Sequence, residues 1–213
     1  ATEEDTISSE EGVQQGSPTS SAAFAWTIHP EVVEADRALF EACGGGARFG
    51  QDDGYFFGTP EAVYQTLRTF DEAIGRSTGA RLRLDKCKVY TQGRPERMEG
   101  APPGLQPGRI EIGEGTWAYG INIFKVPGGE EAFVAETLRQ KGQDVADIIT
   151  RVREDLRAHP QELWTLTYYS LQHRITYWLR LCAPQDTLEM AETVDATIHT
   201  AVELCTDCSF PPG

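Results

Sequence analysis

Two adjacent carboxylates, Asp52 and Asp53, are the residues of this chain whose types and spacing best suit chemistry. They occur in the stretch Phe49-Gly50-Gln51-Asp52-Asp53-Gly54-Tyr55-Phe56-Phe57, where an Asp-Gly turn signal separates two apolar runs. This pattern predicts a β-hairpin with the carboxylates at its tip. Joined by a third carboxylate, the pair could hold two divalent metals for phosphoryl transfer, although a purely structural polar turn gives the same pattern.

The cysteines offer a second and weaker metal-site candidate. There are five of them, Cys43, Cys87, Cys182, Cys205 and Cys208, and the last two form a lone Cys-x-x-Cys pair. A structural zinc site needs two further ligands, so we interpret the pair as packing at a helix end plus a free thiol. An odd number of scattered cysteines indicates an intracellular, reducing compartment.

Composition places the chain among soluble globular proteins. It has 213 residues, 39% of them hydrophobic and 24% charged, which suffices for one large domain or two small ones. No apolar run approaches the ~18 residues that a membrane helix needs, and the acidic, Ser-rich start predicts neither a signal nor a transit peptide. Because Ala1 is not a methionine, we expect the chain to be a fragment or a processed product.

The net charge of -14 argues against tight binding of nucleic acid by this chain on its own. Lys and Arg side chains that neutralise phosphates supply most of such affinity, and a nucleic-acid-binding domain normally carries a basic face. Nucleic acid is therefore a disfavoured partner on composition alone. One basic cluster partly offsets the acidity, and its members are Arg76, Arg81, Arg83, Lys86, Lys88, Arg94 and Arg97.

A helix is predicted before the Asp pair, and this helix must help to position the two carboxylates. Ser17 suits the N-cap and Pro18 the first helical position, while Cys43-Gly44 suits the C-terminal end. Pro30 is expected to kink this helix or to divide it in two. One face is predicted to carry Phe24, Ile28, Val32 and Leu39.

A second helix is predicted after the hairpin, which we place at about 47–58. Thr59-Pro60 suits its N-cap and first position, and Gly79 suits its end. The alternating pattern of residues 81–85 predicts a strand that continues to residue 90. The apolar face of the helix is predicted to consist of Val63, Leu67, Phe70 and Ile74.

The remaining chain predicts two more strands and then three helices. A Gly/Pro-rich loop over 92–108 precedes strands near 109–112 and 118–125, and Pro127-Gly128-Gly129 is expected to break the chain. Three helices are predicted to form a small bundle. The first covers about 130–158 and would be interrupted at Gly142, the second follows Pro160, and the third begins near Asp186. One face of the second helix is predicted to carry Leu163, Leu171, Ile175 and Trp178, and one face of the third to carry Leu188, Ala191, Ile198, Val202 and Cys205.

The order of four motifs resembles the reverse transcriptase family, especially retroelement-type RNA-directed DNA polymerases. The loop Gly12-Val13-Gln14-Gln15-Gly16-Ser17-Pro18 resembles the family's Q-G-(D/S)-P motif, and Gln51-Asp52-Asp53 falls where its Y-x-D-D hairpin belongs. Residues 79–88 resemble its G-L-x-L-N-x-x-K segment, and residues 120–129 resemble the strand pair that grips the primer.

The resemblance implies an α+β fold in two parts. Residues 1–129 would be a partial polymerase palm, in which an antiparallel sheet with the catalytic-type hairpin packs on two helices. Residues 130–213 would be a three-helix, thumb-like bundle. The implied activity is RNA-directed DNA polymerisation by two-metal nucleotidyl transfer.

The resemblance also implies a role for each matched residue. Asp52 would bind Mg²⁺ or Mn²⁺, with Asp53 beside it as a weaker or more distant metal partner. Lys86 would lie near the triphosphate, as a charge or as a proton donor to the leaving group, although a solvated lysine at a strand end gives the same pattern.

The Q-G-S-P loop would contact nucleotide and template. Gln15, Gly16 and Pro18 are the residues of this chain that match it, and a glycine there lets the backbone approach the nascent base pair closely.

Several departures from the family pattern bear on activity. The upstream metal-binding Asp and the fingers are absent, Gly50 replaces the Tyr of the hairpin motif, and Arg83 replaces the Asn of the lysine segment. From Glu130 to Asp207 there are 14 acidic residues against 7 Lys and Arg, which suits a duplex poorly. The isolated chain is therefore expected to be inactive.

Three hypotheses remain open at this point. The chain is the palm-and-thumb half of a polymerase, a non-catalytic structural or interaction subunit derived from a retroelement, or an unrelated α+β module. The first two share a consequence: without the upstream strand, the sheet edge beside the hairpin is expected to need a protein partner, for example by strand addition.

Overall fold

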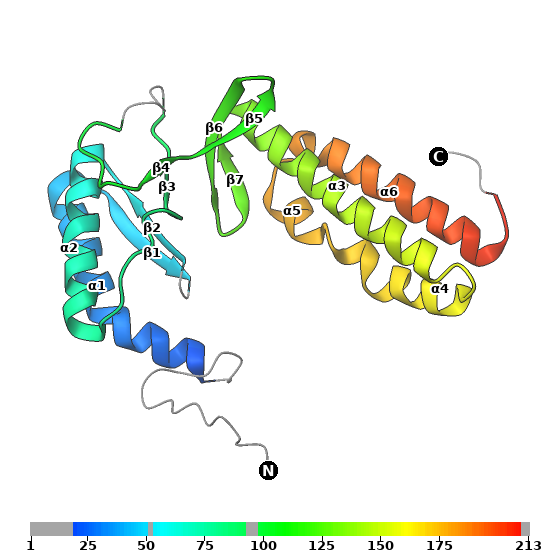
Figure 1. Cartoon of the computed structure of the whole chain (residues 1–213), viewed down its shortest axis with the longest axis horizontal. Coiled ribbons are helices and arrows are strands. Elements are labelled where there is room, and N and C mark those ends of the chain that lie inside the picture. The colour runs from blue at the N-terminus through cyan, green and yellow to red at the C-terminus, as the bar shows by residue number, and fades with distance from the viewer. Residues whose placement is uncertain (1–18, 51–52, 93–97, 210–213) are drawn as a thin grey trace, which may run out of the picture. The chain divides into compact units, whose positions relative to one another are not determined.

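The computed structural model describes residues 19–50, 53–92 and 98–209 (Figure 1). The fold is mixed α+β, with 60% of the described residues helical and with small sheets, which confirms the predicted fold class at this level. The chain divides into two compact units, one of residues up to 87 with 98–106, the other of 88–97 with 107–213. The strands of 109–129 thus belong to the same unit as the helices that follow them. The palm-like and thumb-like assignment of 1–129 and 130–213 stays a prediction.

The first unit begins with a helix, a hairpin and a second helix. These are α1 (Ser20–Cys43), the antiparallel strands β1 (Gly46–Gly50) and β2 (Asp53–Phe57), and α2 (Pro60–Thr78). The predicted hairpin and both helices are therefore confirmed within the described residues. Of the two expectations for Pro30, a division of the first helix is wrong, because α1 is continuous through it, and a kink stays a prediction.

The core of the first unit lies between the two helices and the hairpin. Leu67, Phe70 and Ile74 are buried on the predicted face of α2. Gly44 ends α1 in the left-handed conformation that a glycine adopts without steric cost. The buried cluster consists of Ala35, Leu39, Ala47, Phe70 and Ile74.

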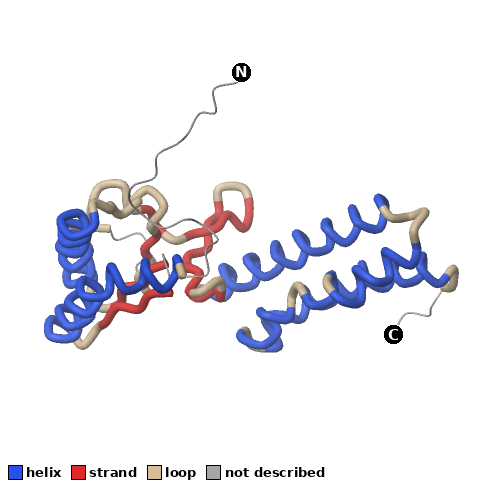
Figure 2. The backbone as a smooth tube through the Cα atoms, turned by 90° about the horizontal axis from the view of Figure 1, so that it is seen from below, coloured by secondary structure: helices blue, strands red, loops and turns tan. Residues whose placement is uncertain are grey.

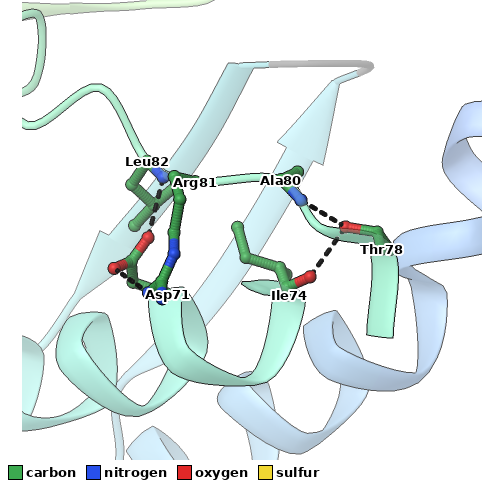
Figure 3. A network of polar contacts seen from close by, with 6 residues as sticks. All are labelled: Asp71, Ile74, Thr78, Ala80, Arg81 and Leu82. Carbon is green, nitrogen blue, oxygen red and sulfur yellow. Dashed lines mark hydrogen bonds and ion pairs between the residues drawn. The ribbon is translucent and has the colours of Figure 1, made fainter. Parts of the chain in front are cut away.

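The predicted strand over 81–90 is wrong in most of its length. Only β3 (Lys88–Val89) is a strand, and it pairs with β4 (Gln106–Pro107). Figure 3 shows the reason: the carboxylate of Asp71 accepts the Leu82 N–H at 2.8 Å and the Arg81 guanidinium at 3.1 Å. The hydrogen bond to Asp71 takes up the Leu82 N–H, a group that a strand would place in a ladder, and residues 83–87 form a turn instead.

The second unit contains a three-stranded antiparallel sheet. Its strands are β5 (Arg109–Gly113), β6 (Thr116–Ile123) and β7 (Val126–Gly129), in that order. The expected chain break at Pro127-Gly128-Gly129 is wrong, because these residues form an edge strand, where proline is tolerated.

The helices of the second unit are α3 (Glu131–Asp155), α4 (Pro160–Tyr169), α5 (Thr176–Leu181) and α6 (Pro184–Thr206). Helices α3 and α6 lie side by side, and the shorter helices follow one another along them (Figures 1 and 2). The predicted second helix is broken, because a 3₁₀ turn, η1 (Leu171–His173), separates α4 from α5.

Close packing of α3 against α6 forms the core of the second unit. Gly142 is buried in an uninterrupted α3, and a Cβ built there would lie 3.1 Å from the Cα of Met190. The predicted face of α6 is wrong at Leu188, which is 58% exposed. The buried cluster comprises Leu138, Val145, Ile149, Leu171, Ile175, Met190, Val194 and Ala201. None of the helices in the described ranges combines the length and the apolar character that crossing a membrane requires.

Candidate functional site

The candidate site is the turn end of the β1–β2 hairpin. The described strands pair from Gly46 with Phe57 to Gly50 with Asp53, so Asp53 belongs to the last described pair. Its side chain is exposed and makes no ion pair with the residues that the structure describes. Asp52, the principal carboxylate of the predicted pair, lies outside the described residues.

Three phenylalanines fix the hairpin on α2. Phe49 of β1 and Phe56 of β2 meet edge to face, with ring centroids 5.6 Å apart. Both also contact Phe70 of α2, at 5.4 and 5.5 Å. Gly54 completes the arrangement, because a Cβ there would come within 2.5 Å of the Phe49 ring. Alternation along the strand then directs Asp53 to the opposite face from this cluster.

Asp36 fixes the hairpin on α1. One carboxylate oxygen accepts the Ala47 N–H at 2.8 Å and the Arg48 guanidinium at 2.7 Å. Both hydrogen bonds hold the pKa of Asp36 below its ordinary value, and the one from the Ala47 N–H has the larger effect. Arg48 also donates to the Ala47 carbonyl, so side chains occupy both backbone groups of Ala47. Such contacts protect this part of the β1 edge against further strand pairing.

A shallow cavity of about 310 Å³ lies between α1 and β1. Apolar side chains from both elements dominate its lining, and His29, Asp36 and Arg48 add polar groups. It adjoins the β1 edge, where the sequence predicts a partner.

Lys86 lies in the turn after α2, and not on the strand that the sequence predicts. Its side chain is exposed, and its backbone N–H donates to the Arg83 carbonyl at 2.8 Å. Arg83 forms a two-bond ion pair with Asp85, at 2.9 and 2.7 Å. Hydrogen bonding from Arg83 lowers the pKa of Asp85. Within the described chain, no hydrogen bond or ion pair joins Lys86 to Asp53.

The remaining predicted site residues, Gln15, Gly16 and Pro18, lie outside the described residues. Their proposed contact with nucleotide or template stays a prediction, as does the role of Asp52.

The described residues do not by themselves make a site for Mg²⁺ or Mn²⁺. Across residues 19–50, 53–92 and 98–209, no group of three His, Cys, Asp or Glu side chains is placed to hold a metal. Asp53 is the only carboxylate that the described part of the hairpin contributes. The Cys205 and Cys208 thiols at the end of α6 are free. The divalent metal stays a prediction that requires carboxylates beyond those described.

Sequence reasoning missed Asp36, although a signal for it exists. It lies one residue from the buried Ala35 on a face that is otherwise apolar, and an acidic residue there needs a partner. Local patterns gave no sign that this partner is the backbone of β1.

Comparison with known proteins gives no relative: no protein-family model, curated protein or solved structure matches this chain.

Proposed function

We propose that this chain is a reverse transcriptase-type palm segment followed by thumb-like helices. Its role would be to present the acidic hairpin to a carboxylate and fingers that other sequence supplies. The observation that carries this proposal is the hairpin with Asp53 at its turn end, flanked in sequence by two helices and attached to both. Asp36 of α1 and Phe70 of α2 make these attachments.

Rigid attachment supports this role because a metal-binding carboxylate must be held within a fraction of an ångström of its working position. The motif order supplies the reaction class, RNA-directed DNA polymerisation. The described residues lack the further carboxylates that a divalent metal needs, so we propose no catalytic step for the isolated chain.

Calorimetric titration with Mn²⁺ tests the proposal. We expect weak binding, with a dissociation constant on the order of millimolar, which Asp52→Asn and Asp53→Asn each weaken. Glu72→Gln is the matched control, because this glutamate is an exposed acidic residue on α2. A Mn²⁺ dissociation constant that neither hairpin substitution changes would refute a metal-binding hairpin.

Primer extension provides a second readout. We expect no extension of an oligo(dT) primer on poly(rA) by the isolated chain, because the described residues contribute a single hairpin carboxylate. Extension that survives Asp52→Asn would contradict the assignment of this hairpin as the catalytic one.

A non-catalytic interaction subunit is the second candidate. The open cavity between α1 and β1 and the net charge of -14 favour it, because both suit a protein partner better than a nucleic acid. Absence of any hairpin-dependent Mn²⁺ binding would leave this candidate in place of the first.

A further inference from the structure

Within the helical part of the second unit, one stretch differs in charge from the helices around it. Between Asp155 and Asp186, Glu162 is the only acidic residue, and three arginines but no lysine occur. The stretch is therefore basic within a chain of net charge -14. It comprises α4, η1 and α5, which follow one another along α3 and α6 (Figure 1).

The same stretch exposes large apolar side chains. Helix α4 buries Leu163 and Thr167, which leaves its other faces to solvent. Trp164 stacks on Tyr168, with ring centroids 6.1 Å apart, and Tyr169 is 74% exposed. No residue of α5 is buried. We refer to the exposed large apolar side chains of this stretch together as the aromatic strip, and its members are Trp164, Leu166, Tyr168, Tyr169, Tyr177, Leu179 and Leu181.

The three arginines of the same stretch have no carboxylate partner in the described part of the chain. Arg157, Arg174 and Arg180 are exposed, and none of them forms an ion pair there. In contrast, Arg139 and Arg153 of α3 are each paired with a glutamate. An unpaired guanidinium presents a planar set of donors that matches a carboxylate or a phosphate.

We propose that the aromatic strip binds an acidic, amphipathic segment of a partner protein. Protein interfaces are enriched in Trp, Tyr and Arg and depleted of Lys, Asp and Glu, which is the composition of this stretch. The partner's apolar side chains would cover the strip, and its carboxylates would pair with the arginines. The strip and the hairpin belong to different units, and the inference does not depend on the proposed function.

Nucleic acid fits the surface less well. Affinity for a phosphate backbone depends on many Lys and Arg side chains, and this stretch offers three arginines and no lysine. Three exposed leucines give no stacking surface for bases but suit an apolar protein side chain.

Fluorescence anisotropy with defined probes tests this proposal on the full chain. The first probe is a labelled amphipathic helical peptide with leucines on one face and glutamates on the other. The second replaces every glutamate with lysine, and the third is a 20-nucleotide oligothymidylate. At about 0.15 M salt, where long-range repulsion is screened, we expect only the glutamate peptide to bind.

Variants locate the binding surface. Combining Trp164→Ala, Tyr168→Ala and Arg174→Ala should weaken binding of the glutamate peptide about tenfold or more, as loss of an interface hot spot does. Trp26→Ala and Arg151→Ala are the matched controls and should change it less than about twofold. Trp26 is 85% exposed in the first unit, and Arg151 is an exposed residue of α3.

Three outcomes would overturn the proposal. They are equal binding of the lysine peptide, no binding of the glutamate peptide, and binding that the triple variant retains while its circular dichroism is native. Oligothymidylate binding that the triple variant loses would instead assign the strip to single-stranded nucleic acid.

Discussion

The indole Nε1 of Trp178 donates a hydrogen bond to the backbone carbonyl of Lys125 at 2.9 Å. The neighbouring Tyr177 hydroxyl donates to the Phe124 carbonyl. Phe124 and Lys125 connect β6 to β7, and both have positive φ, at 48° and 67°. Residues other than glycine adopt this conformation at a steric cost. The two hydrogen bonds from α5 offset that cost, so the short helix holds the turn of a strand pair far from it in sequence.

Replacing Trp178 with phenylalanine should therefore destabilise the second unit. The substitution keeps an aromatic ring but removes the N–H donor, so we expect a loss of about 1 kcal/mol in the free energy of unfolding. Urea denaturation followed by helical circular dichroism would measure it as a lower midpoint with an unchanged slope. Trp164→Phe is the control, since Trp164 has no hydrogen bond to a described residue and should change the midpoint little. Equal effects of both substitutions would contradict the role of the Lys125 hydrogen bond.

Asp36 should make the attachment of the hairpin depend on pH. Its pKa in the folded chain lies below the ordinary value of 3.8, because the Ala47 N–H and the Arg48 guanidinium stabilise the ionised carboxylate. Its contribution to stability is therefore fully present above about pH 3.8 and is lost as the pH falls through the lower folded value.

Hydrogen exchange measured by mass spectrometry would test this expectation. Protection of residues 46–57, corrected for intrinsic exchange rates, should fall in the native chain as the pH drops below about 3.8. In Asp36→Asn, which cannot ionise, the fall should be smaller. Identical pH dependence in the two chains would show that Asp36 does not control the hairpin.

Gly54→Ala should distort the aromatic cluster beneath the hairpin. The added methyl would meet the Phe49 ring at 2.5 Å, so the ring must move, and we expect a loss of about 1–3 kcal/mol in stability. Gly128→Ala is the matched control in another strand, where a Cβ meets nothing within 4 Å. Thermal unfolding should place Gly54→Ala well below the native chain and leave the control within a few degrees of it. Two equal shifts would indicate a general effect of alanine in a strand.

Gly142→Leu should separate α3 from α6. A Cβ at this position already lies 3.1 Å from the Cα of Met190, and a leucine cannot fit without moving one helix. We expect a loss of about 3 kcal/mol or more, larger than the gain in helix propensity. Gln143→Leu, on an exposed face of the same helix, should cost less than about 1 kcal/mol. Chemical denaturation would compare the two variants, and similar denaturation midpoints for Gly142→Leu and Gln143→Leu would refute close packing at Gly142.

The sequence predicts those elements whose signals are local. The apolar spacing of Leu67, Phe70 and Ile74 and the glycine at position 79 predict α2, because helix periodicity and a left-handed C-cap depend only on near neighbours. The hairpin could be predicted in the same way, because turn residues between two apolar runs specify it. The structure of segment 81–90 could not be predicted in this way. Asp71 of α2, eleven residues before Leu82, accepts the Leu82 N–H that would have formed a ladder.

The sequence by itself determined the mixed α+β class, the acidic hairpin and the basic, aromatic composition of the stretch between Asp155 and Asp186. Tertiary structure alone decided which groups meet. It joins Asp36 to the Ala47 amide, Trp178 to the Lys125 carbonyl and Gly142 to Met190. Each contact joins residues from different elements, and its energy depends on how those elements pack. Local propensity carries no information about that packing, so the pattern of residues could not foretell these contacts.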